Sequence, residues 1–485
     1  MKQHDPMIAA IVQEVIERLQ PHLSSPALVR TRASSSDGVF ATVDEAVKAA
    51  AAAHSHLAAM SLEKRGQIID LIRQTCYDKA EEWGRLELDE TQIGRLDHKI
   101  EKLKVIRNVL GVEALKTEAR SDTSGVCIIE YAPFGVIGLV LPATHSIPTM
   151  ASNAINVIAG GNTAVFSPHP AAARCAIHAI QVLNEEIERQ FTIRDLICTV
   201  QSPSVESANA LFNHPEVSLI CVTGGPAVVK AAMQAGKRVI AAGPGNPPVV
   251  VDATADLDNA ARSIIEGGGF DNNLLCIGEK EVFVLAGVAE AFMSAMKRAG
   301  AVQLNVSQIE KLTQTVFTFE QGKGSGCGRA HVRREYVGKD AAVLAEIVGL
   351  RVPPKTELLF GETAEEHAFV QEEQMMPFVP VVKVASIDEA IRAAVKAEHG
   401  YRHTAIIHSQ NLANITKMAK AMNTTLFVVN APCTASLGSN GPGYLSYSIA
   451  TPTGEGVTTP LTFLRQRQLT VGQALHLVLP CLLHG

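Results

Sequence analysis

The chain has 485 residues, of which 47% are hydrophobic and 19% are charged, a composition typical of an ordinary globular protein rather than a disordered or fibrous one. Its length is sufficient for two or three domains. The net charge of -6 and the pI near 6.3 leave no basic excess, so nucleic acid is not expected as a partner.

Cysteine usage and the first residues indicate a cytoplasmic protein. Nine cysteines form an odd set without a CxxC pair, which argues against a zinc ribbon or a disulfide framework and for a reducing compartment. The N-terminus carries no basic segment leading into an apolar signal core. His54 and His56 lie two residues apart, on different faces of an expected helix, so no metal site is predicted there or elsewhere.

Residues 5–20 form the first predicted element, an amphipathic helix. Its apolar residues recur with the spacing of one helical face, while Glu14, Glu17 and Arg18 fall on the opposite face. Residues 21–38 are rich in Ser, Pro and Gly, which is typical of a flexible linker. A helix on such a tether is suited to docking onto another protein. The alternative is that it folds back onto the body or onto a neighbouring subunit.

Residues 41–115 carry helical patterns throughout, and Thr42 with Glu45 predicts a capping box at the start of the first helix. A β-hairpin is expected next, near 120–132. No Asp, Glu, Lys or Arg occurs in 132–173, which invites a membrane assignment, but no 18-residue apolar run survives there. Buried parallel strands that are apolar on both faces explain this stretch better, so no membrane association is predicted.

Three strand-like runs follow one another, and each is succeeded by a helical pattern. The runs read GVIGLVLPA, NTAVFSPHP and VSLICVTGG. A strand, a loop and a helix repeated in this way predict an α/β fold with a doubly wound parallel sheet. Sheets of this kind bind their ligands at the carboxyl ends of the strands.

Phosphate-binding motifs are weak in this sequence. The G-x-G-x-x-G fingerprint and the G-x-x-x-x-G-K-[ST] loop are both absent. Thr223, Gly224 and Gly225 stand between a strand and a helix, where free N–H groups favour phosphate, although such turns also use glycine for steric reasons. Glu373, with Glu372 before it, either holds a ribose or belongs to a solvated loop. The run GKGSGCG at 322–328 is expected to be a mobile loop.

Cys276 stands out among the nine cysteines because of its surroundings. It follows Gly267–Gly269 and Asn272–Asn273, after a helix expected over 256–265 and before a clear strand. Backbone N–H groups in such a loop can face the oxyanion that a nucleophilic thiol creates, whereas most cysteines are simply part of a core. Cys276 is therefore the predicted nucleophile, and Cys433 is the second candidate.

The cysteine loop also carries a family resemblance. FDNNLLCIGEKEVFV, together with VIGLVLPATHSIPT, GGNTAVFSPHPAA, VTGGPAVV, AAGPGNPPVVVD and FVQEEQMMPFVPVV in this order and spacing, resembles the aldehyde dehydrogenase superfamily. The resemblance is to its CoA-acylating branch, the propionaldehyde and acetaldehyde dehydrogenases of bacterial microcompartments, and extends roughly over residues 40–470. It implies NAD as cofactor (with NADP as an alternative), CoA as co-substrate and a short-chain aldehyde as substrate.

The resemblance implies a role for each matching residue. Cys276 would attack the aldehyde carbon, and its backbone N–H would face the oxyanion together with the side chain of Thr144, where hydrolytic members carry Asn. Hydride transfer to NAD would then leave an acyl-thioester on Cys276. Glu373 matches the acid that holds the nicotinamide ribose. The remaining matches, at positions that line the adenosine and the pyrophosphate, are Ser167, Pro168, Thr223, Gly224 and Gly225.

The sequence departs from the hydrolytic members at AAGPGNPP, where Ala242 stands in place of their glutamate base. Removing a general base slows a step that needs it by about 10² to 10⁴. Water attack on the thioester needs this base, whereas a CoA thiol with a pKa of about 8.5 supplies thiolate without it. We therefore expect acyl transfer to CoA. The open alternatives are a hydrolytic enzyme in which another carboxylate replaces the base, and a non-catalytic shell-interaction protein.

The expected organisation follows the family. An NAD-binding domain spans 39–242, a catalytic cysteine domain spans 243–440, and a small β segment at 441–475 serves oligomerisation, as a homodimer or homotetramer. The helix in residues 1–20 resembles the encapsulation peptides of such enzymes. The resemblance therefore implies that residues 5–20 bind shell proteins of a bacterial microcompartment in the cytoplasm.

Overall fold

The computed structural model describes residues 37–319, 330–438, 441–473 and 475. After a short first strand, four helices follow one another. The expected targeting helix, nearly all of the linker and the loop at 322–328 lie outside the described residues. Thr42 and Glu45 form the predicted capping box, which is confirmed. The four helices are α2 (Val43–Ala58), α3 (Leu62–Asp78), α4 (Ala80–Thr91) and α5 (Leu96–Lys104).

A six-stranded parallel sheet follows, in the order β1-β6-β5-β4-β7-β8. Successive strands run outward from β4 in one direction and then in the other, so the predicted doubly wound sheet is confirmed. The strands are β1 (Val39–Phe40), β4 (Val136–Leu141), β5 (Thr163–Pro168), β6 (Ile197–Val200), β7 (Val217–Thr223) and β8 (Arg238–Ala242).

Helices cover both faces of this sheet. Ile137 and Leu139 of β4 join the core formed with α3, α6 and α7, whereas Val136 and Val140 join the core formed with α2, α8 and α9. Burial on both faces accounts for the uncharged stretch, because every residue of β4 and α6 is buried. None of the described helices is both long and apolar enough to span a membrane. The added helices are α6 (Ser146–Ala159), α7 (Ala173–Phe191), α8 (Val205–Asn213) and α9 (Pro226–Met233).

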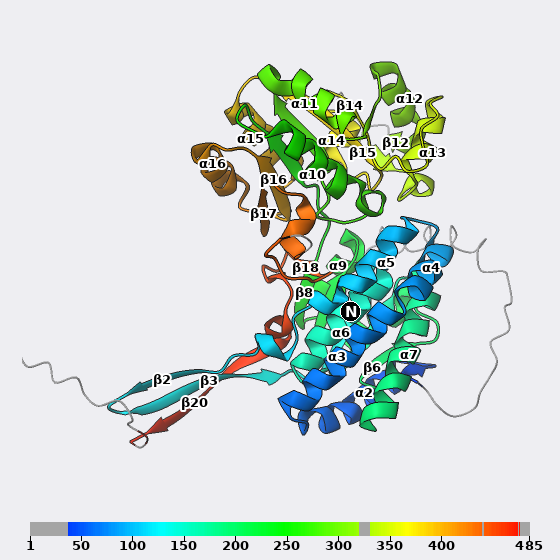
Figure 1. The fold of residues 1–485 in the computed structure, drawn as a ribbon. Coiled ribbons are helices and arrows are strands. Elements are labelled where there is room, and N and C mark those ends of the chain that lie inside the picture. The colour runs from blue at the N-terminus through cyan, green and yellow to red at the C-terminus, as the bar shows by residue number, and fades with distance from the viewer. Residues whose placement is uncertain (1–36, 320–329, 439–440, 474, 476–485) are drawn as a thin grey trace, which may run out of the picture. The chain divides into compact units, whose positions relative to one another are not determined.

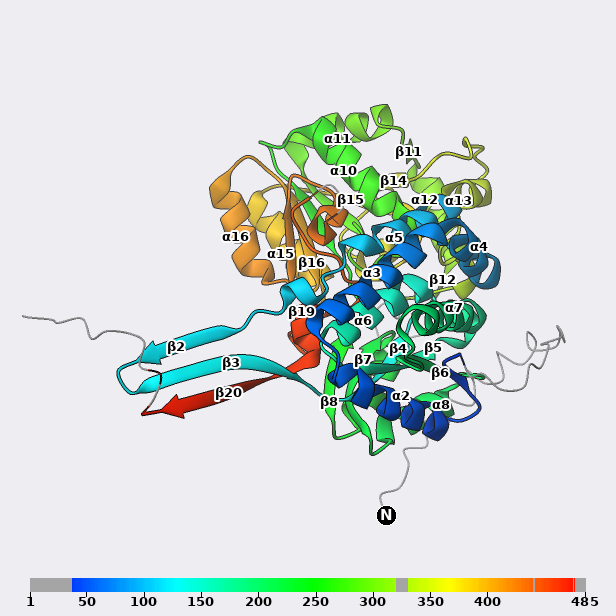
Figure 2. The same ribbon diagram turned by 60° about the horizontal axis from the view of Figure 1, so that its bottom comes forward.

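A second parallel sheet has seven strands in the order β11-β14-β15-β10-β9-β16-β17. Val249 and Val251 of β9 face one core and Val250 faces another, in which α15 and α16 pack together (Figure 2). The strands are β9 (Pro248–Val251), β10 (Glu281–Leu285), β11 (Val302–Gln303), β14 (Leu359–Glu362), β15 (Phe378–Val384), β16 (Thr404–His408) and β17 (Leu426–Val429).

The helices of this second region come from between its strands. They are α10 (Leu257–Gly269), α11 (Ala286–Arg298), α12 (Val306–Val316), α13 (Ala341–Ile347), α14 (Ala368–Gln371), α15 (Ile387–Ala397) and α16 (Leu412–Met422). Two short antiparallel pairs form separate sheets, namely β12 (Phe317–Phe319) with β13 (Ala330–Val332), and β18 (Ile449–Ala450) with β19 (Gly456–Val457).

A three-stranded antiparallel sheet forms a long ribbon in Figure 1. It consists of β2 (Glu118–Asp122), β3 (Gly125–Pro133) and β20 (Leu464–Gly472) in that order. The last strand therefore pairs with β3 of its own chain. It is also an edge strand whose central residues are exposed, and an exposed edge is suited to contact with another chain.

The structure corrects the expected role of the three glycines before Cys276. The helix continues beyond residue 265 to Gly269, so Gly267–Gly269 form its last turn and are buried, not part of an open loop. A Cβ atom on Gly267 would overlap Oε2 of Glu279, and one on Gly269 would lie 3.1 Å from Cβ of Glu357. These glycines are needed for close packing.

Replacing Gly267 by alanine is therefore expected to lower the free energy of unfolding by about 1–3 kcal/mol, because the added methyl group must displace a buried carboxylate. Urea unfolding followed by circular dichroism measures the loss. The matched control is Gly287→Ala in α11, where a Cβ atom meets nothing within 4 Å and helix propensity predicts no loss. Equal stability of the two variants would contradict the packing role.

Candidate active site

Four neighbouring strands of the first sheet bring their carboxyl ends to one edge. Ser167 and Pro168 end β5, Thr144 follows β4, and Thr223 ends β7. Ala242 ends β8 and pairs with Thr223. The order of winding reverses between β4 and β7, which is where ligands of doubly wound sheets bind.

The turn after β7 fits a phosphate group. Gly225 is the N-cap of α9, and no side chain of the described residues caps this helix. A Cβ atom on Gly225 would meet nothing within 4 Å, so the backbone is open to a ligand. The Thr223 hydroxyl, in contrast, is 2.7 Å from Oγ of Ser448. The side chains therefore leave the backbone at this helix start open, and N–H groups at a helix start favour phosphate.

The amino ends of four adjacent strands form the other half of the site. Gly245 precedes β9, Cys276 precedes β10, Glu373 precedes β15 and His403 precedes β16. A Cβ atom on Gly245 would lie 2.5 Å from the carbonyl oxygen of Cys276 and 3.1 Å from Cγ of His403. The Gly245 N–H also donates to the Glu373 carboxylate. Only glycine allows this close approach of the four segments.

Cys276 is half-buried, and its thiol is not ionised at neutral pH. Burial raises its pKa to about 12, and the negative charge of Glu373 adds to the rise. The charge of Lys280 and the N–H groups of Cys276 and Ile277, which donate toward the sulfur, act in the opposite direction. The same N–H groups are placed to stabilise negative charge next to the sulfur.

The pH dependence of Cys276 alkylation by iodoacetamide should measure the raised pKa of its thiol. Since only the thiolate reacts, the rate is expected to rise about tenfold per pH unit and to show no plateau below pH 10, because the thiol pKa is raised to about 12. Glu373→Gln removes a charge that raises this pKa, so the rate at pH 8 is expected to increase several-fold. Glu372→Gln is the control. A plateau below pH 10 in the wild type would contradict the raised pKa of Cys276.

The turn before Cys276 has a strained backbone. Asp271, Asn272 and Asn273 have φ values of 48°, 57° and 64°, a left-handed run in which each residue costs about 1–3 kcal/mol. Side chains hold it: Asn272 Nδ2 donates to the carbonyl of Gly338 at 2.9 Å, and Asn273 Nδ2 donates to the carbonyl of Glu279 at 2.8 Å. The turn is thereby fixed from several directions.

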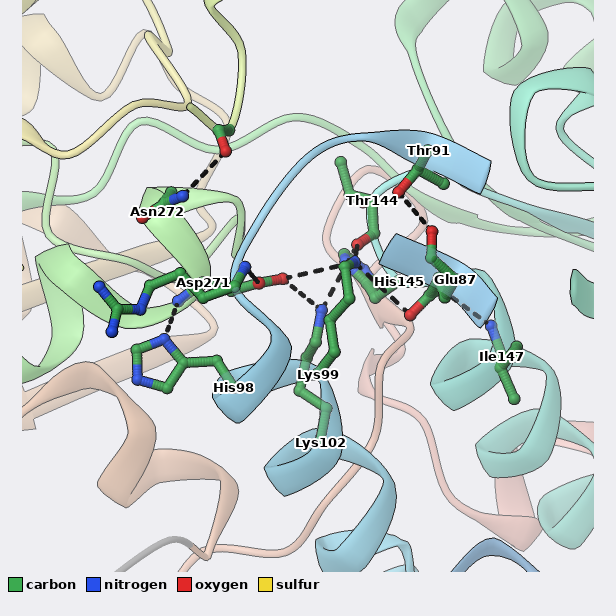
Figure 3. Close-up of polar contacts among 12 residues, drawn as sticks. Glu87, Thr91, His98, Lys99, Lys102, Thr144, His145, Ile147, Asp271 and Asn272 are labelled. Carbon is green, nitrogen blue, oxygen red and sulfur yellow. Dashed lines mark hydrogen bonds and ion pairs between the residues drawn. The ribbon is translucent and has the colours of Figure 1, made fainter. Parts of the chain in front are cut away.

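Asp271 and three further buried charged residues, Glu87, Lys99 and Lys102, form a cluster next to Thr144 (Figure 3). Lys102 Nζ lies 2.5 Å from Oδ2 of Asp271, and Lys99 Nζ lies 3.6 Å from Oε2 of Glu87 and 4.0 Å from Asp271. Both ammonium groups also donate to the Thr144 carbonyl oxygen at 3.4 Å. The network therefore connects the loop after β4 with the turn before Cys276.

His145 belongs to the same region and is neutral. Burial lowers its pKa to about 3, and the positive charge of Lys102 lowers it further. Its ring lies 5.7 Å from that of Tyr447, whose hydroxyl donates to the Lys102 carbonyl at 3.2 Å. These contacts fix the residue that follows Thr144.

Cys433 is placed differently from Cys276. It is fully buried in a short 3-10 turn, Cys433–Leu437, and its N–H donates to Oε1 of Glu279 at 2.8 Å. Burial raises its thiol pKa well above the usual value, and Glu279 adds to this. Burial also raises the thiol pKa of Cys76, Cys175, Cys198 and Cys221. Cys276 is the more accessible of the two candidates.

A cavity of about 340 Å³ lies next to Phe270, which directly precedes the turn of Asp271, Asn272 and Asn273. His98 and Phe270, which stack with ring centroids 4.5 Å apart, form part of its wall. The remaining lining residues are Glu101, Arg262, Ile265, Glu266, Ala299, Glu357 and Thr434.

Sequence reasoning missed Lys99, Lys102, Lys280, Gly245 and His403. The two α5 lysines stand three residues apart in a charged helix, a pattern typical of a solvated face. No pattern in the sequence reveals that partners from distant segments bury them. The doubly wound rule directs attention only to carboxyl ends of strands, whereas the cysteine lies at an amino end.

The comparisons with known proteins agree with this architecture. The sequence pattern described as "Aldehyde dehydrogenase family" matches residues 14–444. The chain is 44% identical to an acetylating acetaldehyde dehydrogenase of Salmonella typhimurium over 91% of its own length and 94% of the relative.

Solved structures give the same result. A Rhodopseudomonas palustris propionaldehyde dehydrogenase with bound CoA and an acylated cysteine is 40% identical, with a TM-score of 0.87 over 92% of this chain and 100% of the other. A propionaldehyde dehydrogenase from the fucose utilisation microcompartment of Clostridium phytofermentans is 40% identical, with a TM-score of 0.87 over 91% and 100%. The chain therefore belongs to the aldehyde dehydrogenase family and is an enzyme of its CoA-acylating branch.

Proposed function

We propose that this enzyme oxidises a short-chain aldehyde, with propionaldehyde favoured, using NAD and CoA to form acyl-CoA and NADH. The observation that carries the proposal is Ala242, which places a methyl group at the end of β8. Hydrolytic members of the family carry a glutamate base at this position, and water attack on a thioester needs such a base. The names of the relatives, an acetylating enzyme and CoA-bound propionaldehyde dehydrogenases, support the same reaction.

In the proposed first step the Cys276 thiol loses its proton to water. The sulfur then forms a bond to the aldehyde carbon, and the carbonyl oxygen becomes an oxyanion. The Cys276 N–H and the half-buried Thr144 side chain are proposed to stabilise it. Thr223, Gly224 and Gly225, with Ser167 and Pro168, are proposed to hold the dinucleotide, and Glu373 its nicotinamide ribose. NAD, when bound, supplies the acceptor for the hydride that leaves the former aldehyde carbon.

The second step transfers the acyl group. The thioester carbon on Cys276 is attacked by the CoA thiolate, the bond to Cys276 breaks, and the cysteine leaves as a thiolate that regains a proton. Thiol-to-thiol exchange needs no general base to activate water. With alanine at position 242, no base at this position activates water. Hydrolysis is therefore slow, while acyl transfer to CoA proceeds.

NADH formation from propanal, followed at 340 nm with and without CoA, tests the proposal. We expect turnover with CoA and a rate at least about 100-fold lower without it, because the base for hydrolysis is missing. Equal rates would identify a hydrolytic enzyme. No NADH under either condition, with NAD binding retained, would identify a non-catalytic protein.

We also propose that residues 5–20 bind shell proteins of a bacterial microcompartment. Their amphipathic pattern supports this, as does the microcompartment origin of a similar enzyme. Deleting residues 1–20 is expected to leave activity unchanged and to abolish co-purification with shells, measured by immunoblotting of purified compartments. Co-purification of the truncated enzyme at wild-type levels would refute the packaging role.

Assembly into a homodimer or homotetramer is proposed from the exposed edge strand β20. Within the part of the chain that the structure describes, β20 pairs with β3 alone, which leaves its other edge for a second copy.

A further inference from the structure

Four buried charged residues take no part in the reaction steps described above, although they lie between the segments that carry these steps. The side chains of Glu87, Lys99, Lys102 and Asp271 are at most 1% exposed. Replacing buried ion pairs by apolar side chains of similar volume is often neutral or stabilising. A contribution to folding stability therefore does not explain why these four charges are buried, and their position suggests another role.

Lys102 contacts both halves of the site. Its Nζ donates to the Thr144 carbonyl at 3.4 Å and to Oδ2 of Asp271 at 2.5 Å. Thr144 follows the central strand of the first sheet, and Asp271 lies in the turn that leads to Cys276. One ammonium group thus connects the proposed oxyanion loop to the proposed nucleophile turn (Figure 3).

Asp271 is held by α5 and its N-terminus in three ways. Its Oδ1 accepts the Arg95 N–H at 2.8 Å, its own N–H donates to Nδ1 of His98 at 2.8 Å, and its Oδ2 accepts from Lys102. The residue has a φ of 48°, and a strained backbone persists only where the surroundings hold it. Strain of this kind clusters at functional sites.

We propose that Lys102 and Asp271 are positioning residues that, with Lys99 and Glu87, fix the Thr144 loop relative to the Cys276 turn. The inference rests on the proposed function, in which Cys276 is the nucleophile. A misplacement of about 1 Å in such a site can reduce the rate about 100-fold without any change in the reacting groups.

Because the cluster is electrically balanced, a double variant that removes one positive and one negative charge can distinguish a positioning role from a role in stability. The cluster holds two ammonium and two carboxylate groups, and Lys102→Met or Asp271→Asn alone leaves one buried charge uncompensated, which is strongly destabilising. The double variant Lys102→Met/Asp271→Asn leaves Lys99 paired with Glu87. Asparagine also tolerates a positive φ and keeps an acceptor for the Arg95 N–H.

We expect both single variants to lower the melting temperature and to reduce kcat at least about tenfold. The double variant is expected to regain most of the melting temperature, while kcat stays at least about tenfold below the wild type. The aldehyde KM and the Kd for NAD, measured by fluorescence titration, should change by less than about threefold in all variants, because the turn after β7 is untouched.

Leu103→Ala is the matched control, because Leu103 is the neighbour of Lys102 in α5 and is buried in the hydrophobic core. It should lower the melting temperature without a comparable fall in kcat. Recovery of kcat together with melting temperature in the double variant would overturn the positioning role. Failure of the proposed function is visible earlier, as wild-type turnover that does not depend on CoA, and is thus distinguished from failure of this inference.

Discussion

Replacing Cys276 by alanine is expected to abolish NADH formation from propanal, with a loss of at least about 10⁴-fold in kcat, because alanine cannot form the covalent intermediate. NAD binding should persist, since the open turn at Gly225 lies on the other sheet. Steady-state assays with CoA present, together with a fluorescence titration of NAD, measure the two quantities separately.

Cys433→Ala is the control for this variant. Cys433 is fully buried, and its main-chain N–H, which alanine keeps, makes the bond to Glu279. We expect most of the turnover to remain. If Cys276→Ala kept its activity and Cys433→Ala lost it, the assignment of the nucleophile would move to Cys433.

Replacing Ala242 by glutamate is the second change with a large expected effect. It supplies a carboxylate at the end of β8, and burial at this position, where Ala242 is 5% exposed, favours a raised carboxyl pKa suited to a base near neutral pH. NADH formation without CoA is expected to increase at least about tenfold, with propionate as the product.

Ala242→Gln controls for the added volume, because it has nearly the same size and no basic group. The glutamate variant should therefore hydrolyse faster than the glutamine variant. Equal CoA-independent rates in the two would show that the missing base at this position does not determine the fate of the acyl group.

The first sheet was predictable because its strands are apolar on both faces. The uncharged stretch from residue 132 to 173 is explained better by buried parallel strands than by a membrane segment. Every residue of β4 and β5 is in fact buried. Strand ends marked by proline, serine or glycine then indicated the edge where Ser167 and Thr223 lie.

The second half of the site was only partly predictable. The flanking residues single out Cys276 as the candidate nucleophile, but they also predict an open loop at the glycines, which the structure places in the last turn of α10. Their use in a helix depends on Glu279, whose carboxylate fills the space that a side chain on Gly267 would occupy. Gly245 and His403 approach Cys276 only through the order of strands in the sheet, which no local pattern contains.

The burial of the charged residues could not be predicted from the sequence either. Lys99 and Lys102 are indistinguishable in sequence from the lysines of a solvated helix. Their burial follows from carboxylates contributed by the preceding helix α4 and by the turn at Asp271, which lies far from α5 along the chain. A buried charge can be inferred only once its partners are known to meet it.

The most direct test of the central claim is the chemical state of Cys276 when CoA is withheld. The enzyme is incubated with propanal and NAD, and the peptide that contains Cys276 is analysed by mass spectrometry before and after CoA is added. The account predicts a propionyl group on Cys276 that persists until CoA releases it as propionyl-CoA. Release as free propionate before CoA is added, or acylation of a different residue, would contradict it.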